Sequence, residues 1–407
     1  MFLKLAIGSL LNRRLTVLLT VLSIMFSTIV VLGVEHLRQE IRNSFSKTVS
    51  GVDLIVGART GGVNLLLYSV FHIGNATNNV TWKSYQEMIS KPGIAWSIPI
   101  SLGDSHRGYR VLGTTSDYFR YFKYGSAMPL HLQQGSPFED YRSQLDAPPV
   151  PDFKAVLGAE VAARLGYQPG HSFVVAHGLG SVSFANHTQY PFTVTGILAP
   201  TGTPVDQTIH ISLESLEAVH RTGPVPDSIT AFMIGLESKL LSFRIQREIN
   251  EYRQEPLIAI MPGVVLAELW QMMNILERVL TLIAGLVLVS ALFGMATMLL
   301  STLQQREREL AVLRALGARP GFLFLLIQTE ALLMTLLGLL SGIVMLTLIL
   351  FLSANWISAS YGLFVSTQVL TPEILPYLGA ALLLSFLLAG LPATLAYRRS
   401  LAIRLSS

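Results

Sequence analysis

The sequence predicts a membrane protein with four transmembrane α-helices, one before and three after a large α+β domain outside the membrane. Three observations carry this prediction: an apolar run near the N-terminus, three apolar runs in the last third of the chain, and a long stretch of mixed character between them. The composition agrees, because 51% of the 407 residues are hydrophobic and only 13% are charged. An ordinary globular domain carries about 25% charged residues.

The first apolar run, residues 15–34, is long enough to cross a bilayer as a helix, which takes about 20 residues. It continues into a charged stretch of helical character, residues 35–42. A cleaved signal peptide would have a shorter apolar core and a cleavage site of small residues. We therefore expect a retained transmembrane helix that continues outward as a stalk, so that residues 1–48 form the first segment of the chain.

Three later runs, residues 279–303, 322–352 and 374–397, also have the length and composition of membrane spans. The loop between the first two is basic, the loop between the last two contains no Lys or Arg, and basic residues follow the last run. Basic residues in short loops mark the cytoplasmic side of a membrane. We therefore expect a multi-pass protein of the bacterial inner membrane with both termini in the cytoplasm and the long middle segment outside.

The middle segment, residues 49–262, mixes short strand-like runs with helical stretches, which predicts an α+β domain. The predicted strands are 52–57, 108–113, 172–177 and 192–198, and the predicted helices are 82–90, 157–165, 212–220 and 239–251. Residues 126–151 are rich in Pro, Gln and Asp and predict a loop or a lobe boundary. Because the chain contains no cysteine, this domain depends on its hydrophobic core rather than on disulfides.

Residues 306–318 of the basic loop show an amphipathic pattern at helical period. A short helix of this kind at the inner face of a membrane either lies in the lipid interface or docks into a groove on a partner. The mixed signs of its charges argue against simple binding to anionic lipid. The apolar face holds Leu310, Leu313 and Leu316, the charged residues include Arg306, Glu307, Glu309 and Arg314, and Gly317 is a suitable C-cap.

The same stretch carries a family resemblance. The pattern Arg-Glu-x-Glu-x-Ala-x-Leu-Arg-Ala-Leu-Gly-Ala, with Glu330 and Gly338 in the next span, resembles the FtsX-type permease domain of ABC transporters. Residues 392–404 resemble the end of that domain. The family includes MacB-type exporters, the lipoprotein-releasing LolC/LolE permeases and FtsX. Residues 1–240 look similar to the matching N-terminal helix and MacB-type extracytoplasmic domain. The resemblance thus implies an FtsX-like permease domain at residues 263–404.

The resemblance implies that residues 306–318 form the coupling helix that sits in a groove of a cytoplasmic ABC ATPase. The phosphate-binding motif Gly-x-x-x-x-Gly-Lys-Ser/Thr is missing from the sequence. We therefore expect ATP and Mg²⁺ to bind a separate ATPase chain, and this chain to have no cofactor and no catalytic residues of its own. The resemblance also implies a second permease copy, identical or related, and leaves open a periplasmic or outer-membrane partner. Nothing indicates nucleic-acid binding.

Two functions remain open at this point. The first is a mechanotransmission (type VII-like) ABC transporter, in which ATP hydrolysis moves the external domain to export or extract a lipoprotein, a peptide or a small molecule. The second is an FtsX-like signalling subunit that regulates a periplasmic hydrolase without transport. A membrane enzyme is a weaker alternative, because the sequence contains no nucleophile–base motif and no metal-binding motif.

Glu330 lies inside the third predicted span, where an ionisable group is costly and is usually paired or functional. We expect it to act as an intramembrane anchor for the coupling loop, paired with Arg314 or Arg319. The alternative is a place on a substrate path.

An uncharged apolar segment, residues 61–82, stands out in the external domain. It is either a buried core segment or an exposed apolar flap that contacts substrate, lipid or a partner. The residues that would make this contact are Leu65, Leu66, Leu67, Tyr68 and Phe71.

The external domain also contains several histidines, which are candidate metal ligands, and one predicted turn. The spacings of His171, His177, His187, His210 and His220 match no compact metal-ligand pair, so we expect no metal site. The segment 201–206 contains Gly and Pro and predicts a turn whose backbone is bonded by Asp206 and the threonines.

Overall fold

The structure is a computed structural model that describes residues 2–48, 50–138, 151–177, 189–220, 226–305, 312, 318–361 and 366–402. The chain divides into two compact units. The helix unit comprises Met1–Glu40, Asn274–Ser358 and Val365–Ser407. The α+β unit comprises Ile41–Met273 and Ala359–Phe364.

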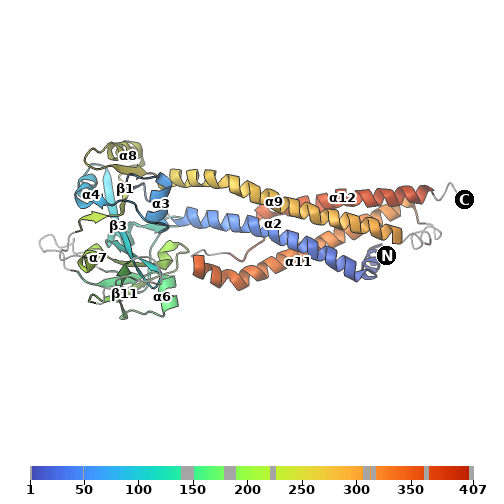
Figure 1. Cartoon of the computed structure of the whole chain (residues 1–407), viewed down its shortest axis with the longest axis horizontal. Coiled ribbons are helices and arrows are strands. Elements are labelled where there is room, and N and C mark those ends of the chain that lie inside the picture. The colour runs from blue at the N-terminus through green and yellow to red at the C-terminus, as the bar shows by residue number, and fades with distance from the viewer. Residues whose placement is uncertain are drawn as a thin grey trace. The chain divides into compact units, whose positions relative to one another are not determined.

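Within the described residues, four long helices each contain a stretch that is long and apolar enough to cross a membrane (Figure 1). They are α2 (Arg14–Thr48), α9 (Pro262–Gln305), α11 (Pro320–Tyr361) and α12 (Leu375–Ala402), with α1 (Phe2–Leu11) before α2 and the 3-10 turn η4 (Pro372–Ile374) before α12. The four predicted apolar segments are thus confirmed as helices. Three of the helices extend well beyond the predicted spans, because the apolar run ends where polar residues begin while the backbone hydrogen bonds continue.

Small residues bring two of these helices close together. A Cβ atom placed on Gly338 would lie 2.5 Å from Cγ2 of Ile24, and one placed on Gly342 would lie 2.8 Å from Cβ of Thr28. The two glycines are one turn apart on α11, so α11 can approach α2 closely, as small residues allow in membrane helix pairs. Ile24 is fully buried in the apolar core of this unit.

The α+β unit is built on one mixed sheet. Its strand order is β15-β1-β14-β3-β4-β12-β8-β11-β7, with β10 paired to β3 and β9 paired to β11. The strands are β1 (Leu54–Ala58), β3 (Ile94–His106), β4 (Tyr109–Thr114), β7 (Leu132–Gly135), β8 (Lys154–Leu157), β9 (Ser172–Phe173), β10 (Ala176–His177), β11 (Phe192–Leu198), β12 (Thr208–Ser212), β14 (Ala231–Leu236) and β15 (Leu257–Ile260). Two further pairs are β2 (Val80–Thr81) with β13 (Ser228–Ile229) and β5 (Lys123–Tyr124) with β6 (Met128–Pro129).

Helices cover both faces of the first half of this sheet. Ile55 of β1 lies in one apolar cluster with α3 (Gly62–Val70), whereas its neighbours Leu54 and Val56 lie in another cluster with α4 (Trp82–Ile89) and α8 (Ser242–Asn250). This split follows from the alternation of side chains along a strand. Residues of α6 (Ala159–Leu165) and α7 (Leu213–His220) pack on the second half, and α5 (Asp117–Tyr121) contributes to the first cluster. The predicted α+β domain is therefore confirmed.

Three local predictions are corrected. The strand expected at 172–177 is two short strands, because Phe173 pairs with β11 while Ala176 pairs with β3. The helix expected from residue 157 begins at Ala159, since Leu157 completes β8 and Gly158 is the N-cap. The loop expected at 126–151 contains β6 and β7 in its described part, and residues 139–150 lie outside the described residues.

Candidate functional site

Glu330 is held by a residue that sequence reasoning did not find. It lies in α11 and is 3% exposed. The hydroxyl of Ser9, on α1, donates to Oε1 of Glu330. Of the two arginines expected as partners, Arg314 lies outside the described residues and Arg319 has an exposed side chain. The bond to Ser9 joins α1 to α11, and a role of Glu330 in anchoring the coupling loop stays a prediction.

A second polar cluster lies in the second half of α2. Both carboxylate oxygens of Glu35, which is 3% exposed, accept hydrogen bonds. Arg38 donates to Oε1 at 2.6 Å and Gln39 donates to it at 2.9 Å, while the Tyr377 hydroxyl of α12 donates to Oε2 at 3.3 Å. Arg38 also contacts Glu277 of α9 at 3.4 Å. We call these five residues the Glu35 cluster; they connect α2, α9 and α12.

His36, next to this cluster, connects α2 to the segment before α12. It is 2% exposed, and its Nε2 atom lies 2.7 Å from the backbone oxygen of Ser366, in the segment before α12. A buried polar group is costly unless it is bonded, and here each buried side chain has a partner on a different element. The arrangement can fix the relative positions of these three helices; it contains no nucleophile–base pair.

Polar side chains between the two clusters are also bonded. The hydroxyls of Thr335 on α11 and Ser385 on α12 lie 2.7 Å apart. The Gln328 amide donates to the backbone oxygen of Phe386 at 3.1 Å. Bonds of this kind hold membrane helices together where apolar burial alone provides little driving force.

In the α+β unit, the predicted turn at 201–206 is built around Asp206, which is fully buried. Its carboxylate accepts from the backbone N–H of Thr201 at 2.9 Å, from the Thr201 hydroxyl at 2.9 Å and from the backbone N–H of Gly202 at 2.8 Å. Burial raises the pKa of Asp206, and these hydrogen bonds oppose the rise. This turn also packs closely against Gly158, the N-cap of α6. A Cβ atom at Gly158 would lie 2.3 Å from the backbone oxygen of Val205.

The first half of the apolar segment 61–82, up to Phe71, belongs to the core, whereas most residues from Ile73 to Asn79 are exposed. Leu65, Leu66, Tyr68 and Phe71 are at most 6% exposed, and Leu67 is partly buried against the same cluster. Burial raises the pKa of Tyr68 to about 12. The structure thus agrees with the core interpretation and corrects the exposed-flap alternative: α3 buries these side chains against β1, β14 and β3.

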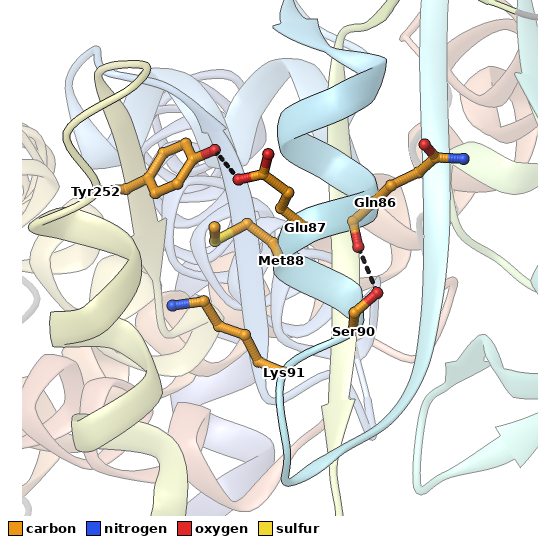
Figure 2. A pocket seen from close by; sticks show the side chains of 6 residues that line it. All are labelled: Gln86, Glu87, Met88, Ser90, Lys91 and Tyr252. Carbon is orange, nitrogen blue, oxygen red and sulfur yellow. Dashed lines mark hydrogen bonds between the residues drawn. The ribbon is translucent and has the colours of Figure 1, made fainter.

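A pocket of about 510 Å³ lies between α4 and the segment after α8. Figure 2 shows the Tyr252 hydroxyl directed at Glu87, and the two are 2.5 Å apart. Lys91, on the same rim, pairs with Glu248 at 3.7 Å. Because the charged groups around the pocket already have partners within the chain, they indicate no particular ligand.

Comparison with known families identifies the chain. The model of the MacB-like periplasmic core domain matches residues 15–252, more than half of the chain, and that of the FtsX-like permease C-terminal domain matches residues 281–402. The chain is a MacB/FtsX-type ABC permease. The resemblance found in the sequence is thereby confirmed. This family consists of permease subunits that work with an ABC ATPase in a membrane, which supports a multi-pass protein of the inner membrane.

Two solved structures are similar to the permease. The extracellular domain of the noncanonic ABC-type transporter YknZ from Gram-positive bacteria is 12% identical, with a TM-score of 0.32, and the match covers 51% of this chain and 98% of that one. The periplasmic region of MacB from Actinobacillus actinomycetemcomitans is 10% identical, with a TM-score of 0.36, and the match covers 55% and 94%. The family assignment rests on the two family models and not on these similarities. No curated protein matches the permease in sequence.

The predicted coupling segment of the permease falls almost wholly outside the described residues. α9 ends at Gln305 and α11 begins at Pro320. Between them the structure describes Val312, Ala318 and Arg319. The predicted coupling residues Arg306, Glu307, Glu309, Leu310, Leu313, Arg314, Leu316 and Gly317 all lie outside the described part, so their role stays a prediction.

Several histidines of the α+β unit have side-chain partners within that unit. Burial lowers the pKa of His210 to about 4 and that of His72 to about 3. Asp104, 3.3 Å from Nε2 of His220, raises the pKa of that histidine. His171 accepts from the backbone N–H of Gln168, whereas His187 lies outside the described residues. The described residues contain no group of three or more His, Asp or Glu that could hold a metal ion.

The sequence analysis missed the Glu35 cluster because it interpreted residues 35–42 only as a stalk that continues the first span. One signal was available: an acid at the edge of the apolar run with Arg38 and Gln39 one turn later, the spacing of helical neighbours. The partners Glu277 and Tyr377 gave no local signal, because they are distant in sequence and meet Glu35 and Arg38 only after the helices pack.

Proposed function

We propose that this permease is the membrane subunit of a mechanotransmission ABC transporter, in which a separate ATPase moves the α+β domain to export or extract a substrate. One observation carries the proposal beyond family membership. α2 and α9 each run without interruption from an apolar span to the α+β unit, over 35 and 44 residues. A continuous helix transmits displacement along its axis, so rigid-body motion of the spans reaches the domain.

The contact with the ATPase is assigned to residues 306–318, between α9 and α11. Helix α9 enters this segment directly from the α+β unit, which gives the shortest covalent route between an ATPase inside and the domain outside. Leu313→Glu places a charge on the apolar face of the predicted coupling helix, and we expect it to release the ATPase.

Purification of the tagged full-length permease from its own host tests the proposal. We expect one ABC ATPase to copurify, and ATP hydrolysis by the complex in nanodiscs to change the distance between the α2–α9 pairs of the two permease copies. Leu313→Glu should lose the ATPase, whereas Leu240→Glu, on the exposed surface of the α+β unit, should retain it. Absence of any ATPase from the wild-type preparation would contradict the proposal. Capture of a wall hydrolase, with no substrate transported, would favour the signalling function instead.

A second permease copy is part of the same proposal. Met272, Ile275 and Leu276 of α9 precede the predicted span, yet are 62%, 73% and 52% exposed in the single chain. Apolar side chains outside the lipid at this exposure are typical of a surface that a partner covers. The chain contains no cysteine, so Ile275→Cys should form a specific disulfide dimer in native membranes. Leu240→Cys, which is 91% exposed on the α+β unit, is the control for random collision.

A further inference from the structure

The Glu35 cluster places charged and polar groups where apolar packing would be less costly. Earlier in α2, Ile24 and Thr28 pack closely against Gly338 and Gly342 of α11. At Glu35 the contacts are directed hydrogen bonds to a nearly buried carboxylate. A buried ion pair is weak support for stability, because well-packed apolar residues often serve as well or better. Its distinctive property is that it accepts one geometry and penalises others.

The donors to Glu35 come from two helices. Arg38 and Gln39 lie on α2, whereas Tyr377 lies in the first turn of α12. Arg38 uses its other terminal nitrogen to contact Glu277, which is 14% exposed on α9. The carboxylate of Glu35 therefore links α12 to α2 directly and orients the Arg38 side chain that links α2 to α9.

We infer that Glu35 is a positioning residue that holds α2, α9 and α12 in one arrangement at the level of Glu277 and Tyr377, so that movement of the spans displaces the three helices as one body. This inference rests on the proposed function, because it assigns a role to Glu35 within the stroke driven by the ATPase. Without the carboxylate, the Tyr377 hydroxyl and Arg38 lose their shared acceptor, and α12 is held less firmly to α2.

The charges around the cluster support this role. Among the groups that the structure joins in it, Glu35 and Glu277 are acidic and Arg38 is basic. Arg38 is thus shared between two acids on two helices, at 2.6 Å from Glu35 and 3.4 Å from Glu277. Since a cation between two anions is held from both sides, separation of α9 from α2 leaves one of the acids without its counter-ion.

Two substitutions separate the acceptor function of Glu35 from its volume. Glu35→Met keeps a side chain of similar length and removes both acceptors, whereas Glu35→Gln keeps one carbonyl acceptor. Tyr377→Phe removes the single bond to α12 and leaves the aromatic ring. Glu40→Met, on the same helix but outside the cluster, is the matched control.

The experiment uses the full-length permease purified with its ATPase and placed in nanodiscs. Because the chain contains no cysteine, Leu37→Cys on α2 and Leu375→Cys on α12 give two defined sites for nitroxide labels; the native side chains are 46% and 61% exposed. Labelled protein is diluted into unlabelled protein so that distances within one chain dominate. Distances are measured by pulsed electron paramagnetic resonance without nucleotide and with ATP and vanadate, alongside ATPase activity.

We expect one narrow distance in wild type and in Glu40→Met, in both nucleotide states. Glu35→Met should broaden the distribution in both nucleotide states while ATP hydrolysis continues. Glu35→Gln should keep the narrow distance, and Tyr377→Phe should broaden it less than Glu35→Met. A narrow, wild-type distance in both Glu35→Met and Tyr377→Phe would overturn the inference. If no ATPase copurifies, the proposed function fails, and the nucleotide-free distances still test whether Glu35 holds α12 to α2.

Discussion

Asp206 offers the sharpest quantitative test of the α+β unit. Asp206→Ala removes the acceptor for the backbone N–H groups of Thr201 and Gly202, in a turn where the carboxylate is fully buried. The Thr201 hydroxyl retains a partner in Thr203 at 2.7 Å, so we count the two amides alone. A buried donor left unsatisfied costs about 1–3 kcal/mol, and the half-buried Thr201 and Gly202 lie at the low end of that range. We therefore expect unfolding to require about 2 kcal/mol less free energy.

The assay is thermal unfolding of the purified full-length permease in detergent, followed by tryptophan fluorescence. A loss of 1 kcal/mol lowers the midpoint by roughly 2–4 °C for a domain of about 200 residues. Asp206→Ala should thus lower the first transition by at least about 4 °C on the same scale. Asp206→Asn keeps one carbonyl oxygen and should fall between Ala and wild type. An unchanged midpoint for Asp206→Ala would refute the reasoning, because the orphaned amides would then cost nothing.

Three further substitutions test the packing and the buried histidine. Gly338→Ala should destabilise the helix unit through its clash with α2, whereas Gly285→Ala, which meets nothing within 4 Å, should be neutral or stabilising; detergent unfolding of both variants decides this. Gly158→Ala should lower the unfolding midpoint more than an exposed Gly-to-Ala change, since its Cβ would meet backbone rather than a movable side chain. The pKa of His210 is about 4 when folded and about 6.5 when unfolded, so the unfolded chain binds more protons in acid. The stability that this neutral histidine provides is complete above about pH 6.5 and falls by about 1.4 kcal/mol per pH unit down to about pH 4. His210→Gln should therefore make the midpoint of thermal unfolding less dependent on pH in this range.

The order of membrane spans and external domain along the chain was predictable because each is indicated by a contiguous stretch of sequence. A bilayer requires about 20 apolar residues in one run, and four such runs became helices. Strand β11 begins at Phe192 and ends at Leu198, as alternation and flanking turn residues predicted. The family pattern around residues 306–318 also lies within one contiguous stretch, so the order of residues alone is enough to recognise it.

The rest depends on contacts between distant residues. The segment with Leu65 and Tyr68 is apolar whether it is buried or exposed, and only the packing of α3 on the sheet decides between the two. Ser9 and Glu330 are 321 positions apart, and Tyr377 and Glu35 are 342 apart. No period or spacing in a single sequence joins such residues. Sequence therefore indicated that Glu330 needs a partner and could not name Ser9.

The way in which the two long helices join the sheet has a mechanical consequence. α2 leads into β1 and β15 leads into α9, and these strands are antiparallel neighbours with Ile55 opposite Ile260. Displacement of β1 and β15 past each other along their length loads their hydrogen bonds in shear, so all of them resist together. Separation of the two strands at the end where α2 and α9 are attached loads the same bonds in peel, where the bonds nearest Ile260 break first. This edge of the sheet therefore resists sliding of its strands more strongly than their separation.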